Sequence, residues 1–521
     1  MRRLGLLAGA AVAAASSACG TDHAGYVLVT VDARPAVHDA AAITVTLANA
    51  GTMRTDTLML AGKSFPVTFS VSSPGRSGDL AIAVDASDAG GLVIGHGSAM
   101  TTVSASAAKV VLDATDFVVN TDYAGDQFPT DDSQAAGFQL AALPDGTWTT
   151  VFRDGCMQNA CNVFARRFDR AGKPVTTQAA ASTNAFVVTA RPTTDLAEPA
   201  IAASPNATLA VWNFSDVGTA TTTGVACRPI DAAGRLAADQ TSIATETASV
   251  VSAAAMASGN FAVTWKTTLP AMNDVDAIHM VVVKPDCTPV GAIVELAKGA
   301  VFADFVHRGS VASSADQVLF AWITNGELFT SLMPSTGAPS PGMKLIAKTT
   351  TPAPPLEVEH ARVAALPGGG FLIAVSWTLQ TGTGPGRIDL FRVDTKGMLS
   401  GSPVQVTDQS DGDPLNAESF GLASRPDGSI LLAWHVCNAN GDSCVLSGRI
   451  LQLTADANPM SWAIPVTDVF AIPTTTGGSD KRASVVGLPD AFAVVWSDSS
   501  MKPPDTAGQA VRARLIYPPG S

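Results

Sequence analysis

The stretch Leu422-Ala-Ser-Arg-Pro-Asp-Gly-Ser-Ile430, which leads to Trp434, decides the fold. It indicates an alternating strand, a Pro-Asp-Gly turn and a second strand that ends in an aromatic residue. Similar stretches begin at Phe138, Val363 and Val485. The aromatic residue that ends the second strand recurs at nearly regular intervals: Phe152, Trp212, Trp265, Trp322, Trp377, Trp434 and Trp496. From about residue 118 onward the chain therefore consists of seven copies of one β-rich repeat.

Each copy continues with a third strand, a turn such as Asp169-Arg-Ala-Gly-Lys-Pro-Val175, and a fourth strand such as Val404–Asp408. Four antiparallel strands in each copy are typical of a propeller blade. We therefore predict an all-β chain with a seven-bladed β-propeller over residues 118–521. The seven aromatic residues are predicted to pack in the core between blades. The last copy stops after its third strand, and 118–122 matches the missing fourth strand, so it is predicted to close the ring.

Residues 25–116 lack the repeat but alternate with period two, as in Gly25-Tyr-Val-Leu-Val-Thr-Val-Asp32 and Lys109-Val-Val-Leu-Asp113. Six or seven short strands in such a segment predict a small β-sandwich domain. It is similar to immunoglobulin-like or transthyretin-like modules, although it lacks the Cys and Trp hallmarks of true immunoglobulin domains. We expect it to act as a spacer beside the last blade.

The N-terminus carries Arg2 and Arg3, then the apolar run Leu4–Ala15, which is too short to span a bilayer. The following Ser16-Ser-Ala-Cys-Gly20 resembles a bacterial lipobox, and Ser16 stands where that pattern usually has Leu. The resemblance implies a signal peptide at 1–18, a lipidated Cys19 and a tether at 19–24. It implies an exported protein, lipid-anchored in the bacterial cell envelope at the outer membrane or cell surface, that contacts the membrane through its anchor only. A plain secretory signal peptide is the alternative.

Four of the remaining cysteines form two close pairs at matching points of the repeat. We predict disulfides between Cys156 and Cys161 and between Cys437 and Cys444, as expected in an oxidising compartment. Neither pair has metal-ligand spacing. The pairing of Cys227 and Cys287 stays open.

The net charge of -13, without a basic stripe, argues against a nucleic-acid partner. No catalytic motif stands out, and the seven histidines lack metal-ligand spacing. One loop offers hard oxygen ligands for calcium, and the alternative is a solvated acidic turn. Its candidate ligands are Asp408, Asp411, Asp413 and Asn416, and a comparable cluster comprises Asp122, Asp126, Asp131 and Asp132. No other cofactor is expected.

Acidic residues also occur near the start of the innermost strand in six copies: Glu198, Glu246, Asp304, Glu359, Glu418 and Asp480. They would form an acidic mouth of the central channel that attracts cations or a basic ligand. Ordinary polar loop residues explain them equally well.

The leading hypothesis is a monomeric, non-enzymatic binding lipoprotein whose propeller face binds an envelope protein or a glycan, because the scaffold is present without catalytic residues. The alternative is a polysaccharide hydrolase or lyase that uses carboxylates such as Glu359 and Glu418. A third interpretation is a structural surface protein.

Overall fold

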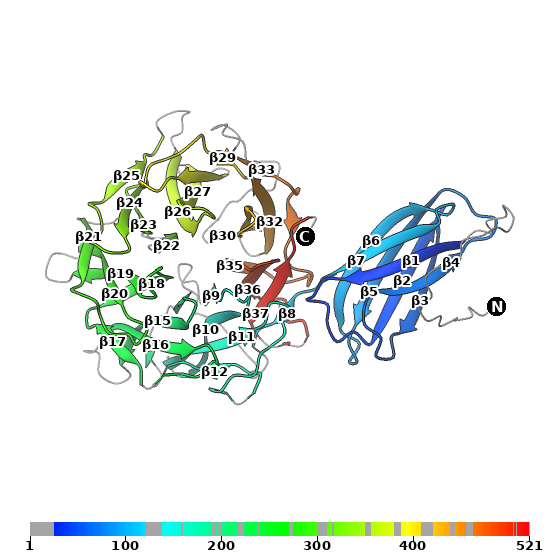
Figure 1. The fold of residues 1–521 in the computed structure, drawn as a ribbon, viewed down its shortest axis with the longest axis horizontal. Coiled ribbons are helices and arrows are strands. Elements are labelled where there is room, and N and C mark those ends of the chain that lie inside the picture. The colour runs from blue at the N-terminus through cyan, green and yellow to red at the C-terminus, as the bar shows by residue number, and fades with distance from the viewer. Residues whose placement is uncertain are drawn as a thin grey trace.

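A computed structural model of the chain describes residues 26–120, 138–157, 160–180, 182–189, 193–194, 199–216, 223–237, 239–269, 275–299, 310–314, 317–349, 356–379, 387–407, 420–437, 443–454, 462–503, 505–506 and 508–519. Within these residues every regular element is a strand, so the all-β prediction is confirmed. Two domains lie side by side, a seven-bladed propeller and a curled sheet (Figure 1). No helix among these residues is long and apolar enough to cross a membrane.

The N-terminal domain is one sheet of seven strands in the order β3-β2-β5-β6-β7-β1-β4. The strands are β1 (Tyr26–Ala33), β2 (Ala42–Asn49), β3 (Thr52–Met59), β4 (Val67–Ser72), β5 (Asp79–Ser87), β6 (Val93–Thr102) and β7 (Ala107–Ala114). Strand β1 pairs in parallel with β7 and antiparallel with β4. The small β-sandwich predicted for this segment is thus a curled sheet whose hydrogen bonding is continuous.

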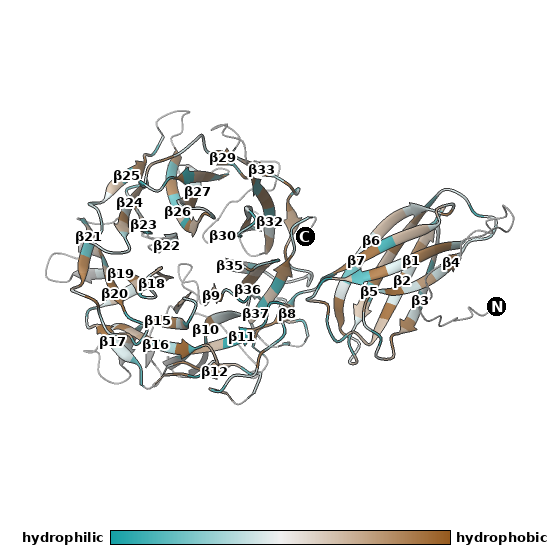
Figure 2. Ribbon diagram, viewed as in Figure 1, coloured by the Kyte–Doolittle hydropathy of each residue, from teal (hydrophilic) through white to brown (hydrophobic). Residues whose placement is uncertain are grey.

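Alternation along the strands builds the core of this domain. Val27, Val29 and Val31 of β1 are fully buried, whereas Tyr26 and Leu28 are exposed. Successive side chains of a strand point to opposite faces, so the period-two pattern of the sequence places one face inward. Figure 2 shows the same mixture of hydrophobic and hydrophilic residues along the strands of both domains.

The propeller begins with two blades that share strand pairing. Blade 1 contains β9 (Phe138–Ala142), β10 (Trp148–Met157), β11 (Ala160–Phe168), β12 (Phe186–Val187) and β13 (Thr193–Thr194). Blade 2 contains β14 (Ala200–Ala203), β15 (Ala207–Asp216), β16 (Thr223–Asp231) and β17 (Thr241–Ala244). Strand β13 pairs with both β11 and β15, which joins the two blades into one nine-stranded sheet.

The next four blades are separate antiparallel sheets. Blade 3 contains β18 (Ala248–Ala255), β19 (Phe261–Leu269), β20 (Val275–Val283) and β21 (Val294–Gly299). Blade 4 contains β22 (Ser310–Ser314), β23 (Gln317–Thr324), β24 (Glu327–Pro334) and β25 (Met343–Ile346). Blade 5 contains β26 (Leu356–Ala365), β27 (Phe371–Leu379), β28 (Arg387–Val393) and β29 (Val404–Gln405). Blade 6 contains β30 (Phe420–Ser424), β31 (Ser429–Cys437), β32 (Cys444–Leu453), β33 (Ala463–Pro465) and β34 (Phe470–Ala471).

Blade 7 joins the two ends of the propeller. It contains β35 (Asp480–Gly487), β36 (Phe492–Asp498) and β37 (Ala510–Ile516), and its fourth strand is β8 (Phe117–Val118). Val118 pairs with Arg512, and the Val119 N–H donates to the Val511 carbonyl over 2.7 Å. Residues 117–119 therefore complete the last blade, whereas 121–122 of the predicted closing segment lie outside the described residues.

The seven aromatic residues at the end of the second strands are all buried between blades, with exposed fractions of 0 to 4%. Counted from the turn after the innermost strand, six of them occupy one position, and Trp377 does not. The blade 5 turn closes between Leu366 N and Gly370 O, as the blade 1 turn closes between Leu143 N and Thr147 O. By that count Val375 matches Phe152. Trp377 lies two residues further along the same face, which corrects its place in the repeat.

Arginines of four third strands hold neighbouring blades together. Arg228 donates to the Val188 carbonyl over 2.9 Å, and Arg514 donates to the Ile472 carbonyl over 2.7 Å. Arg166 and Arg449 donate in the same way to the carbonyls of Val119 and Val406. Each acceptor follows or belongs to the outer part of the preceding blade, so the bonds link blades 5 to 6, 6 to 7, 7 to 1 and 1 to 2.

The curled sheet is fixed to the propeller by several contacts. Arg34 lies over the Tyr517 ring at 5.3 Å, and Lys173 Nζ lies 3.0 Å from Asp39 Oδ2. Arg514 Nε donates to the Ala114 carbonyl over 2.9 Å. The linker therefore consists of few residues, and both of its flanks are hydrogen-bonded to the last blade.

Candidate functional site

Three innermost strands carry a β-bulge near the aromatic position of the next strand. The register shifts in β18 between Ser249 and Ser252, in β26 between Val358 and His360, and in β35 between Lys481 and Ser484. Val250 and Arg482 have positive φ angles of 54° and 63°, which non-glycine residues rarely adopt. Bulges at the rim of a sheet re-aim side chains and are frequent beside functional sites. The channel end of the propeller where these bulges lie is therefore the candidate site.

Two carboxylates near the starts of innermost strands accept hydrogen bonds from tryptophan. The Trp496 Nε1–H donates to Asp480 Oδ1 over 3.1 Å, and the Trp265 Nε1–H donates to Glu246 Oε1 over 2.5 Å. Both carboxylates thus help to hold the buried indole of their own blade. This bonding favours a structural role for Asp480 and Glu246 over a charged channel mouth. Three further acidic residues of that set lie outside the described residues: Glu198, Asp304 and Glu418.

Blade 3 places an imidazole between two carboxylates. His279 Nδ1 lies 2.6 Å from Glu246 Oε1, and His279 Nε2 lies 3.9 Å from Glu295 Oε2. The His279 side chain is 11% exposed and stands edge-on to Trp265, with ring centroids 6.0 Å apart. These contacts attach His279 to the buried aromatic residue of blade 3.

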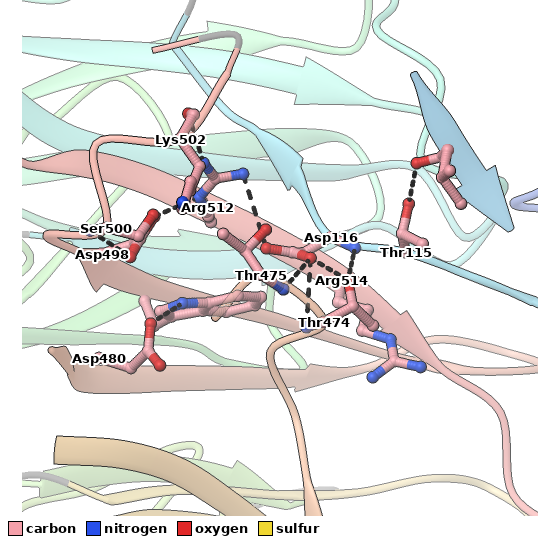
Figure 3. A network of polar contacts seen from close by, with 12 residues as sticks. Thr115, Asp116, Thr474, Thr475, Asp480, Asp498, Ser500, Lys502, Arg512 and Arg514 are labelled. Carbon is pink, nitrogen blue, oxygen red and sulfur yellow. Dashed lines mark hydrogen bonds and ion pairs between the residues drawn. The ribbon is translucent and has the colours of Figure 1, made fainter. Parts of the chain in front are cut away.

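Blade 7 contains a cluster of buried charged side chains (Figure 3). Arg512 donates from Nε to Asp498 Oδ2, and its Nη1 lies 3.6 Å from Asp116 Oδ2. The Arg512, Asp116 and Asp498 side chains are at most 2% exposed. Asp116 Oδ1 also accepts the backbone N–H groups of Thr474 and Thr475 over 3.2 and 3.1 Å. The cluster therefore connects the linker, the ring closure and the last blade.

A third carboxylate, Asp480, adjoins this cluster. Burial, and next the negative charge of Asp498, raise the pKa of Asp480 to about 7 from its ordinary value of 3.8. The Trp496 hydrogen bond and the Arg512 charge oppose this rise. One guanidinium does not neutralise three buried carboxylates, and a proton on Asp480 near neutral pH removes one of the two remaining negative charges. The described residues contain no cluster of His, Cys, Asp and Glu with metal-binding geometry.

The structure describes some of the predicted cysteine pairs. Cys444 is disulfide-bonded, and Cys437 stands directly opposite it in the register of β31 and β32. Cys227 of blade 2 forms a disulfide with Cys287 of blade 3 across a Cα–Cα distance of 6.2 Å, which resolves the pairing that the sequence left open. The side chains of Cys156 and Cys161 lie outside the described set, as does Cys19.

All the candidate calcium ligands also lie outside the described residues: Asp408, Asp411, Asp413, Asn416, Asp122, Asp126, Asp131 and Asp132. The calcium site therefore stays a prediction.

Sequence reasoning missed one residue of the channel end, Arg362. A signal for it was present, because aligning Leu366-Pro with Leu143-Pro places Arg362 at the position of Gln139. The strand register agrees with that alignment: Arg362 pairs with Ala374, and Gln139 pairs with Val151.

No family model matches the chain, and no curated protein matches it. Its propeller fold is shared at low identity with solved glycosidases and sialidases. The α-L-arabinofuranosidase Arb93A from Fusarium graminearum is 10% identical over 78% of this chain and 98% of its own, with a TM-score of 0.41. An α-L-arabinanase from Penicillium chrysogenum is 9% identical over 77% of this chain and 98% of its own, with a TM-score of 0.40. A leech intramolecular trans-sialidase is 9% identical over 95% of this chain and 93% of its own, with a TM-score of 0.36. Nothing about activity follows for this chain.

Proposed function

We propose that this chain is a binding protein whose propeller recognises a glycan or a protein at its variable side. The observation that carries the proposal is the contrast between the two sides of the ring. On one side three of the turns between third and fourth strands are built alike: the Oδ1 atoms of Asp169, Asp231 and Asp394 each accept backbone N–H groups two and four residues further on, over 2.8 to 2.9 Å. Such turns stabilise the scaffold.

The opposite side differs from blade to blade. Its strand ends are joined by segments that range from the three residues 245–247 to the stretches 119–137 and 406–419. Segments that vary in length on a constant scaffold are where binding specificity resides in repeat folds. The bulges of β18, β26 and β35 lie toward the same strand ends. Together these features support recognition at this side of the ring.

The enzymatic alternative has less support. It needs two carboxylates facing each other across an open pocket at roughly 5–10 Å. Glu246 and Asp480 are hydrogen-bonded to buried indoles, and Asp498 is paired with Arg512. Glu418 lies outside the described residues, so its distance from Glu359 is not part of the argument.

The proposal includes attachment to the cell envelope, which rests on the lipobox-like sequence alone. Lipidation is tested by replacing Cys19 with Ser in the whole chain. We expect loss of acyl labelling and release of the protein from the membrane fraction. Unchanged labelling and fractionation would remove the anchor from the proposal.

Binding is tested with the whole chain in two assays, a glycan array and a pull-down from envelope extract. A saturable glycan or protein ligand is expected, and a competing excess of the free ligand should displace it. Failure of both assays would support the structural-surface interpretation instead. Release of shortened oligosaccharides from a polysaccharide during incubation would support the hydrolase or lyase.

A further inference from the structure

One position of the innermost strands forms a ring that we call the collar. On the second strand of each blade, the residue just before the aromatic position pairs with one residue of the innermost strand, and that innermost residue belongs to the collar. In blade 5 the aromatic position is held by Val375. The collar residues are Gln139, Ala200, Ser252, Ser310, Arg362, Gly421 and Ser484. Five of the seven are Ala, Ser or Gly. Arg362 alone brings a charge to this position.

Small residues suit the collar because innermost strands approach each other closely. A Cβ atom on Gly421 of blade 6 would lie 2.4 Å from Cγ2 of Val485 in blade 7, which no real contact allows. Arg362 departs from this rule at the boundary of blades 5 and 6. Its guanidinium lies over the Phe420 ring, 5.8 Å from the centroid, and the residue keeps partial exposure.

Five arginines of the described chain lie over aromatic rings, and four of them have further strong partners. Arg425 lies over Phe492 and donates to the Leu488 and Pro489 carbonyls over 3.1 and 2.8 Å. The other three form ion pairs or bonds to carbonyls: Arg34 with Asp113, Arg387 with Asp389, and Arg166 with Thr183. Within the described residues, the hydrogen bond of the Arg362 guanidinium goes to the carbonyl of Ala361, its neighbour in the same strand, over 3.0 Å.

No carboxylate of the described residues is among the causes that set the pKa of Arg362. Burial is the only cause that lowers the pKa of Arg362, to about 10, so the side chain stays cationic at neutral pH. For Arg425 and Arg514, by contrast, nearby aspartates oppose the lowering of the pKa. Arg362 thus carries its charge in a partly desolvated place, and a partly exposed group perturbed in this way is a candidate for a binding site.

A carboxylate, that of Glu359, precedes Arg362 by three residues in the same strand. Glu359 is the bulged residue of β26; its Oε1 lies 3.9 Å from His360 Nε2, and its side chain is 34% exposed. A ligand that offers an acidic group to Arg362 and hydroxyl donors to Glu359 matches this pair of charges. A sugar with a carboxylate or sulfate group combines both features, whereas an acidic peptide lacks the dense hydroxyl donors.

We propose that Arg362 and Glu359 form a subsite for an acidic glycan at the channel end of the propeller. The guanidinium binds a carboxylate or sulfate group, and Glu359 accepts hydrogen bonds from neighbouring hydroxyls. This inference rests on the proposed binding function and names its ligand class.

Calorimetric titration of the whole chain tests the subsite with four probes: an oligogalacturonate, a sulfated oligosaccharide, a neutral oligosaccharide of equal length and an acidic peptide. We expect one of the two acidic saccharides to bind, and which one binds tells carboxylate from sulfate. Arg362→Ser should raise its Kd by roughly tenfold to a hundredfold, since a charged hydrogen-bonding partner is lost. Arg362→Lys keeps the charge without the planar fork and should give a smaller loss.

Two controls separate binding from folding and from net charge. Arg362→Ser installs the residue that blades 3, 4 and 7 carry at the collar, so its Tm should be no lower than that of the native protein. Arg235→Ser removes the same charge from an exposed turn of blade 2 and should leave Kd unchanged.

Equal Kd values for Arg362→Ser and Arg235→Ser would overturn the inference. A large fall in Tm for Arg362→Ser would also overturn it, by assigning Arg362 to the scaffold. Binding of only the neutral saccharide or the peptide, or of no probe, would exclude an acidic glycan. A ligand captured from envelope extract would still support the proposed function in that case.

Discussion

The three carboxylates around Arg512 predict an unusual pH dependence of stability, carried by Asp480. The pKa of Asp480 is raised to about 7 in the folded chain, from an ordinary value of 3.8. Between these two values the folded state binds more protons than the unfolded state, so the free energy of unfolding falls as the pH rises. The contribution of Asp480 is fully present below pH 3.8 and is lost by the time the pH exceeds about 7.

The size of the effect follows from the shift. A rise of about three pKa units corresponds to at most about 4 kcal/mol between pH 4 and pH 7. Asp480 is 6% exposed, so solvent screens the effect only in part. Asp480→Asn removes the titration and keeps an oxygen that accepts the Trp496 indole N–H. We therefore expect the unfolding free energy of the variant to increase relative to that of the native protein as the pH rises.

Urea denaturation of the whole chain at intervals from pH 4 to pH 8 measures this difference. Other titrating groups are common to both proteins, so the gap between their unfolding free energies isolates Asp480. The matched control is Asp56→Asn, at an edge strand of the curled sheet, where Asp56 pairs with Arg54. Curves for Asp480→Asn and the native protein that run parallel across this range would refute the shared-proton account of the cluster.

Three further outcomes follow from the contacts between blades. Arg514→Met should lower the unfolding free energy in urea by about 2–4 kcal/mol, because two carbonyls lose a charged donor, whereas Arg235→Met should change it little. Replacing Cys227 and Cys287 by Ala should lower it by about 4 kcal/mol on loop entropy, and reductant should then lower the Tm of the variant less than that of the native protein. Gly421→Ser should lower the Tm through the clash with blade 7; an unchanged Tm would mean that the collar has room.

The repeat pattern of the sequence predicted the number of blades and the all-β class, because strand alternation and turn residues are local signals. It misplaced Trp377 for a physical reason. Residues two apart in a strand share a face, so Trp377 and Val375 are both buried. The spacing of hydrophobic residues therefore cannot tell which of these two residues holds the aromatic position of the repeat. Only the hydrogen bonds of the turn at Leu366 reveal the offset.

The contacts between blades were harder to predict, because they join elements that only the closed ring brings together. The Cys227–Cys287 disulfide joins residues 60 positions apart, on a third strand and on the turn of the next blade. Arg166 and Arg228 each precede a turn aspartate by three residues, a spacing visible in the sequence. Their carbonyl acceptors could not be named without the twist that sets one blade against the next.

The pattern of these links bears on why the chain retains Arg362. The boundary of blades 5 and 6 is already fastened at its outer edge, where Arg449 donates to the Val406 carbonyl. Apolar residues of both blades, Leu390 and Leu432 among them, share one core cluster there. A second arginine is therefore not needed to hold these blades together, and a serine at the collar suffices in three others. Arg362 keeps partial exposure and lies over Phe420 at this boundary, and the proposed acidic-glycan subsite would account for a charge that no other blade carries at the collar.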